Sequence, residues 1–245
     1  QGAGMRGLIL GLRENTGGLL DSAREVADRF LDSGLIVRVS GRRADEKQWF
    51  AMRDGTYPGI PLVVIINNSS ASAAEIVSGA LRDHGRAEVV GERSYGKGSV
   101  QEVVELDGDN GAIKLTTAYY YLPSGQSIDR TSRAGRSGEW GVTPTISVPL
   151  TEEQRRTWLA IWREVGREVA SRPVSPMEAD SEAMGEPAGD PAKESSADPD
   201  WAASARIVLK GDIQLRVSLE LLQKRLARPT TQEAQDAASP PSASH

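Results

Sequence analysis

A serine and a lysine that together suit covalent chemistry stand in two short stretches near the middle of the chain. NNSSASAAE (67–75) contains Ser72, and GERSYGKGS (91–99) contains Lys97 between two glycines. A serine hydroxyl becomes a nucleophile when a nearby base takes its proton, and lysine is the usual substitute for histidine in that role. The two stretches therefore suit a hydroxyl nucleophile served by a lysine.

A histidine base is nearly excluded by number and position. The chain has two histidines, His84 and His245. His84 lies on the same predicted helix as Ser72, roughly 18 Å along its axis, and His245 ends a tail expected to be disordered. The chain has no cysteine, so thiol nucleophiles, disulfides and thiolate metal sites are excluded.

Ser72 stands where a predicted buried strand passes into a predicted helix. The N–H groups of a helix's first turn point outward at the positive end of the helix dipole, which suits an oxyanion. The same position is typical of a helix cap, because Ser72-x-x-Glu75 is a capping box with Glu75 as the cap partner. The residues alone leave both roles open.

Lys97 has two other interpretations. Gly91, Gly96 and Lys97 nearly match a phosphate-binding loop, but Gly98 replaces the required hydroxyl and a strand rather than a helix is expected next. Ser94 and Lys97 match the Ser-x-x-Lys of penicillin-binding enzymes, which needs a helix that the glycines disfavour. A nucleotide-binding protein that uses this loop stays open as an alternative.

Hydrophobic periodicity predicts the elements that position these residues. PLVVII is typical of a strand buried on both faces of a parallel sheet. The order of elements predicts an α/β fold with a parallel centre and an antiparallel flank. Helices are expected at 19–31 and 72–84, and strands at 7–12, 34–42, 61–66, 87–91, 99–106 and 111–123.

The chain changes character after Leu150. Residues 1–150 are expected to form a core, with a helix at 151–172 packing on it. Residues 173–200 are acidic and rich in proline, which predicts a disordered insertion. A C-terminal helical segment is expected at 201–228, followed by a disordered tail at 229–245.

Composition limits the partners and the location. The net charge of −5 gives no reason to expect nucleic-acid binding. No stretch approaches the roughly 20 apolar residues of a membrane span. The first residues do not form a signal peptide, and since Gln1 is not an initiator methionine we expect a piece of a longer chain.

Three stretches together resemble the C-terminal processing peptidases, the tail-specific serine proteases of family S41. The similarity runs in order from about residue 5 to 150 and implies a ClpP/crotonase-like core with a mixed, partly parallel sheet and flanking helices. The stretches are GLILGLRENTGGLLDSAREVADRFL, PLVVIINNSSASAAEIVSGALRDHGRAEVVGERSYGKGSVQ and LTTAYYYLPSGQSI.

The resemblance implies a Ser-Lys dyad and assigns its residues by motif position. A lysine in water is protonated at neutral pH, so we expect the base to point inward from its loop. Lys97 and Gln101 would lie about 13 Å apart on an extended strand, so a bulge or turn near Gly98 is expected. The implied roles are Ser72 as nucleophile, Lys97 as general base, Gln101 as the residue that holds the lysine, and the backbone N–H groups of Gly18 and Ala73 as oxyanion donors, with Gly17 the neighbouring possibility.

The resemblance also implies an activity. It predicts an endopeptidase that cleaves unfolded or extended proteins near their C-termini through an acyl-enzyme, without a cofactor or metal. A location outside the cytoplasm, in the periplasm or cell envelope, is implied too, as is an upstream PDZ domain or a homo-oligomer.

The chain departs from the family pattern in several places. Gly11 and Thr145 stand where the family usually has Asp. The PDZ domain and the earlier part of the catalytic core are not in the sequence. A non-catalytic remnant that binds peptides therefore stays as a second alternative.

Overall fold

The computed structural model describes residues 5–42, 45–57, 59–106, 111–171 and 209–227. These belong to two compact units, Gln1–Pro149 with Val217–His245, and Leu150–Arg216. The predicted disordered segments 173–200 and 229–245 lie outside the described residues.

A parallel sheet forms one side of the first unit. Its order is β1-β4-β5-β8, and all three pairings are parallel. Every residue of β4 is buried, as its apolar run predicts. Because parallel strands end at the same edge, the loops after β1 and β4 come together. The strands are β1 (Leu8–Gly11), β4 (Leu62–Ile66), β5 (Glu88–Gly91) and β8 (Ile146–Ser147).

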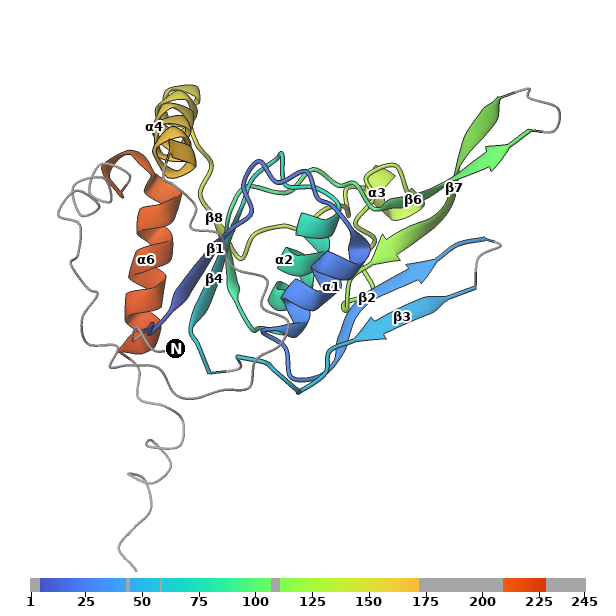
Figure 1. Ribbon diagram of the computed structural model, residues 1–245, viewed down its shortest axis with the longest axis horizontal. Coiled ribbons are helices and arrows are strands. Elements are labelled where there is room, and N and C mark those ends of the chain that lie inside the picture. Colours follow the sequence, from blue (N-terminus) through green and yellow to red (C-terminus); the bar gives the residue numbers. More distant parts are fainter. Residues whose placement is uncertain (1–4, 43–44, 58, 107–110, 172–208, 228–245) are drawn as a thin grey trace, which may run out of the picture. The chain divides into compact units, whose positions relative to one another are not determined.

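An antiparallel sheet forms the other side, in the order β3-β2-β7-β6. The β6–β7 hairpin projects beyond the helices (Figure 1). The α/β class with parallel and antiparallel parts is confirmed, although these parts lie in two sheets and β3 was not expected from sequence. The strands are β2 (Leu35–Ser40), β3 (Lys47–Phe50), β6 (Ser99–Glu105) and β7 (Ala112–Tyr121).

Helices α1 (Leu20–Asp28) and α2 (Ala73–Asp83) lie between the two sheets (Figure 1). Alanines on α1 and apolar side chains of α2 join Leu62, Val64 and Ile66 of β4 and two residues of β2 in one hydrophobic cluster. Residues 74–81 of α2 are all buried, and all of them except Glu75 are apolar or small, as a helix enclosed on all sides requires. The nucleophile candidate therefore begins the most enclosed helix of this unit. A short helix, α3 (Arg133–Arg136), follows the hairpin.

The other face of the parallel sheet is covered by residues 217–226 of α6 (Ile213–Leu226), the part of this helix that belongs to the first unit. Leu222 packs with Val63 and Val90 in a second hydrophobic cluster. Arg225 donates to the Glu88 carboxylate at 3.0 Å. The predicted C-terminal helix thus completes the burial of β4.

The second unit contains α4 (Glu152–Ser171), in the region where the sequence predicts a helix at 151–172. Trp158 is buried, and the Trp162 indole N–H donates to Asp212 at 3.0 Å. Within the described ranges no helix combines the length and the apolar character needed to cross a bilayer.

Candidate active site

Ser72 occupies a strained turn between β4 and α2. Its φ of 56° and ψ of −116° place a non-glycine residue in the region of the backbone map that favours glycine. Such a conformation costs about 1–3 kcal/mol and persists where the surroundings over-determine it, which is common at active sites. A sharp strand-turn-helix that exposes a serine hydroxyl is also how the nucleophile is presented in α/β-hydrolases.

The Glu75 carboxylate joins the turn at Ser72 to the loop that carries Lys97. Its Oε2 accepts the backbone N–H of Ser72 and that of Lys97, each at 2.8 Å. Its Oε1 accepts the backbone N–H of Gly96 at 2.7 Å and the hydroxyl of Ser94. The nitrogens of Ser72 and Lys97 share one acceptor, so they lie no farther apart than twice that bond length. The structure therefore brings the backbones of both candidate catalytic residues together.

Glu75 makes these contacts from the interior. Its side chain is fully buried, and this burial raises the pKa of the carboxyl, while its hydrogen bonds to Ser94, Lys97, Gly96 and Ser72 oppose the rise. Three backbone N–H donors and one hydroxyl supply the polar contacts that a buried carboxylate requires.

The predicted capping box is present. Glu75 serves as the cap partner by accepting from the Ser72 N–H, as expected. The reciprocal contact between the Ser72 hydroxyl and the Glu75 N–H is present too, and the same N–H also donates to the Ser72 carbonyl at 2.9 Å. The Ser72 hydroxyl therefore lies against the first turn of α2.

The loop after β1 brings Gly17 and Gly18 beside Ser72. Gly17 has φ of 100°, and a Cβ on it would lie 2.8 Å from both the Ala71 carbonyl and the Ser72 Cβ, so only glycine fits. The Gly17 N–H donates to the Asn15 side chain at 2.9 Å. Within the described ranges the N–H groups of Gly18 and Ala73 donate to no protein group. These two donors are therefore available beside the hydroxyl.

Buried polar residues that sequence reasoning missed tie this loop to the Ser72 turn. The Asn67 amide donates to the Glu14 carboxylate at 2.6 Å and accepts the Glu14 N–H at 3.1 Å. The Ser70 hydroxyl donates to the Leu12 carbonyl at 2.7 Å. The sequence signal for such hydrogen bonds between loops is weak, because Asn and Ser after a strand are ordinary turn residues.

An apolar cavity of about 160 Å³ opens between these loops and α1. Its walls include Gly17, Gly18 and Ala73. Gly18 and Ala73 carry the two available N–H groups, and Gly17 precedes Gly18 in the chain. The remaining wall is mostly aliphatic, and the full lining is Leu12, Asn15, Gly17, Gly18, Leu19, Ser22, Ala23, Val26, Ala73, Ala74 and Val77.

The side chain of Lys97 does not point inward, and the expectation of a buried amine is wrong for this structure. Gly96 and Gly98 are buried whereas Lys97 between them is exposed. The reason is local: hydrogen bonds draw both glycines inward, so the residue between them faces out. In the part of the chain that the structure describes, no hydrogen bond links the amine to Ser72 or to Gln101.

The strand after the loop contains the irregularity that the sequence required, in a slightly different place. The register of β6 against β7 shifts between Val100 and Gln101 rather than near Gly98. Gln101 is exposed on this edge strand. No hydrogen bond between the side chains of Gln101 and Lys97 accompanies this bulge among the described residues.

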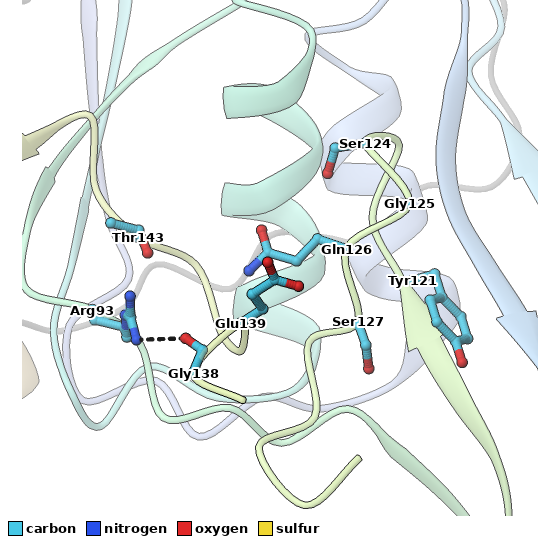
Figure 2. A pocket seen from close by; sticks show the side chains of 9 residues that line it. All are labelled: Arg93, Tyr121, Ser124, Gly125, Gln126, Ser127, Gly138, Glu139 and Thr143. Atoms are coloured by element: carbon cyan, nitrogen blue, oxygen red, sulfur yellow. Dashed lines mark hydrogen bonds between the residues drawn. The ribbon is translucent and has the colours of Figure 1, made fainter. Parts of the chain in front are cut away.

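A larger cavity, of about 560 Å³, lies elsewhere in the first unit (Figure 2). Arg93 in its wall donates to the Gly138 carbonyl at 3.2 Å, and none of the predicted site residues lines it. The smaller cavity, whose lining includes Gly17, Gly18 and Ala73, adjoins the Ser72 turn. No cluster of three or more metal-ligating side chains occurs among the described residues.

Comparison with known proteins shows which family the chain resembles. The model of Peptidase family S41 matches residues 1–148. The Carboxy-terminal-processing protease of Bartonella bacilliformis is 47% identical over 154 residues, which cover 62% of this chain and 33% of that protein. The chloroplastic C-terminal processing peptidase of Tetradesmus obliquus is 34% identical over 145 residues, covering 59% of this chain and 29% of that protein.

A solved structure gives the same result. The photosystem II D1 C-terminal processing protease matches with a TM-score of 0.54 and 33% identity, covering 60% of this chain and 36% of that one. The chain spans about a third of the length of the curated relatives it matches. Because the family match covers residues 1–148 of 245, more than half of the sequence, the chain belongs to peptidase family S41.

Proposed function

We propose that this chain carries the catalytic core of a serine-type endopeptidase that cleaves proteins near their C-termini. The observation that carries the proposal is the single Glu75 oxygen that binds the N–H groups of both Ser72 and Lys97. The relatives' names, which describe C-terminal processing, support cleavage near the C-terminus of the substrate. Extended or unfolded chain ends are the expected substrates.

The proposed reaction begins at the Ser72 hydroxyl. Lys97, in its neutral form, takes the hydroxyl proton as the oxygen bonds to the substrate carbonyl carbon. The oxyanion that forms accepts from the N–H groups of Gly18 and Ala73, which donate to no protein group among the described residues. Breakage of the C–N bond transfers the proton from Lys97 to the leaving amine and leaves an acyl-enzyme. Lys97 then deprotonates a water, which releases the new C-terminus and restores the serine.

This mechanism requires the Lys97 side chain to rotate toward Ser72. The backbone distance set by Glu75 is within the reach of an extended lysine side chain of about 6 Å. A bound substrate would cover the amine and exclude water, which disfavours its charged form. We assign Gln101 the role of holding the amine once it has turned inward.

The small apolar cavity suggests which residue precedes the scissile bond. It adjoins the proposed oxyanion donors, so it is placed to receive the side chain of the residue whose carbonyl is attacked. A volume of about 160 Å³ with aliphatic walls suits a small apolar side chain. An upstream PDZ domain, self-association and a location outside the cytoplasm stay expectations from the resemblance.

The exposure of Lys97 favours one rival, a non-catalytic protein of the same fold that binds extended peptides. The nucleotide-binding alternative gains no such support. The N–H groups of Gly96, Lys97 and Gly98, which a phosphate would need, donate to the carboxylates of Glu75 and Asp129.

A cleavage assay separates the peptidase from the peptide binder. An unstructured protein ending in small apolar residues is incubated with the full chain and with single variants. Cleavage is expected with the wild type and with Ser69→Ala, a nearby serine whose hydroxyl makes no hydrogen bond among the described residues. It is expected to disappear with Ser72→Ala and Lys97→Ala. Binding of the same substrate without cleavage by the wild type would favour the non-catalytic alternative.

A further inference from the structure

The loop that carries Lys97 is held from a second side, by residues 128–130. The Gly98 N–H donates to the Asp129 Oδ2 at 3.1 Å. The Arg130 N–H donates to the Gly96 carbonyl, also at 3.1 Å. Both neighbours of Lys97 are thus bonded to this segment, in addition to the bonds that Glu75 makes.

Close packing accompanies these bonds. A Cβ on Gly98 would lie 2.6 Å from the Asp129 nitrogen and 2.9 Å from the Ile128 Cβ. A Cβ on Gly96 would lie 3.1 Å from the Arg130 Cβ. The two glycines therefore let the loop lie directly against the segment, which gives the Gly-Lys-Gly sequence a structural reason.

The two carboxylate oxygens of Asp129 accept hydrogen bonds from different parts of the chain. Oδ1 accepts the Thr131 N–H at 2.8 Å and the Thr131 hydroxyl at 2.5 Å, which closes a turn. Oδ2 accepts from Gly98, and no other hydrogen bond to this oxygen occurs among the described residues. Asp129 is only 3% exposed. An asparagine at this position would close the same turn with one oxygen and would not place a charge in the interior. The turn therefore does not require the second oxygen, whereas the Lys97 loop uses it.

We propose that Asp129 is a positioning residue for the base: its Oδ2 fixes Gly98 and so keeps the backbone of Lys97 beside Ser72. This inference rests on the proposed peptidase function. Displacement of a reacting group by about 1 Å reduces a rate by about a hundredfold, so a second anchor for the loop has a direct effect on turnover. Asp129 itself touches neither the substrate nor the reacting atoms in this assignment.

Two matched substitutions separate positioning from turn formation. Asp129→Asn keeps the oxygen that closes the turn and places an NH₂ donor against the Gly98 N–H. Thr131→Val removes the hydroxyl from the turn and leaves the Gly98 contact intact. We expect Asp129→Asn to lower kcat about tenfold or more with KM nearly unchanged, and Thr131→Val to leave kcat within about twofold of the wild type.

Hydrogen exchange at the Gly98 amide, followed by NMR, reports the contact without any need for activity. Exchange should accelerate in Asp129→Asn and not in Thr131→Val. Equal kcat in the two variants, or unchanged Gly98 exchange in Asp129→Asn, would overturn the inference while the wild type still cleaves. A wild type that cleaves nothing overturns the proposed function and, with it, the catalytic role given to Asp129.

Discussion

The nucleophile side and the base side of the candidate site share one carboxylate but differ in how far they are organised. On the nucleophile side, buried hydrogen bonds join the loops after β1 and β4, and Ser72 sits in its strained turn beside two available N–H groups. On the base side, the backbone around Lys97 is bonded by Glu75 and Asp129, yet the lysine side chain is exposed.

Side-chain length explains this difference. A serine hydroxyl is one rotatable bond from the backbone, so fixing the backbone of Ser72 nearly fixes its oxygen. A lysine amine lies at the end of a flexible stem that carries about 2 kcal/mol of rotamer entropy. The same backbone anchoring is therefore sufficient for the nucleophile and insufficient for the base, whose amine must be placed by further contacts.

Removal of the shared carboxylate should have the largest effect, because it affects both sides. Glu75→Ala leaves buried donors on Ser72, Gly96 and Lys97 without an acceptor. We expect the free energy of unfolding to fall by about 3–5 kcal/mol, measured by urea denaturation. Glu102→Ala, which removes an exposed glutamate from β6, serves as the control and should change it by less than about 0.5 kcal/mol. Similar losses in both variants would mean that Glu75 does not join the two sides.

A change confined to the nucleophile side should be the next largest. Gly17→Ala introduces a Cβ at φ of 100° and within 2.8 Å of Ala71 and Ser72. We expect a loss of about 2–3 kcal/mol in the free energy of unfolding. Gly18→Ala is the matched control, because a Cβ there meets nothing within 4 Å. Equal stability of the two variants would show that the loop is not packed against the Ser72 turn.

The sequence predicted most of the nucleophile side. The apolar run of β4, the helix that follows it and the Ser72-x-x-Glu75 pattern are local signals, and the structure contains all three elements. The parallel arrangement of β1 and β4 then brings Gly17 to Ser72, a neighbourhood that the family resemblance implied.

Less of the base side was predictable. The contacts of Glu75 with residues 94–97 and of Asp129 with Gly98 join positions more than 18 residues apart, and no local pattern marks them. Lys97 is exposed because hydrogen bonds hold Gly96 and Gly98 toward the interior. The composition of this loop does not reveal those hydrogen bonds. Strand β3 was missed because its polar residues lack a clear apolar alternation.

A smaller effect is expected from pH, again through the shared carboxylate. Burial raises the pKa of Glu75 above that of the unfolded chain, so the folded state binds its proton more tightly. The contribution of this group to stability is complete below the unfolded pKa and is lost as pH rises toward the folded one. Over that interval the wild type should lose up to about 1.4 kcal/mol per pH unit relative to Glu75→Gln. Urea denaturation of both proteins at several pH values measures the difference, and parallel curves would contradict the assignment.

The smallest effect on stability should come from Lys97 itself, and it tests the comparison most directly. An exposed side chain without a hydrogen bond among the described residues contributes little to folding, so Lys97→Ala should change the free energy of unfolding by less than about 0.5 kcal/mol. Gly96→Ala in the same loop should cost more, because its Cβ at φ of 83° would lie 2.7 Å from the Trp140 ring. If Lys97→Ala instead costs as much as Gly96→Ala, the amine is anchored in the free protein, and the base side is as organised as the nucleophile side.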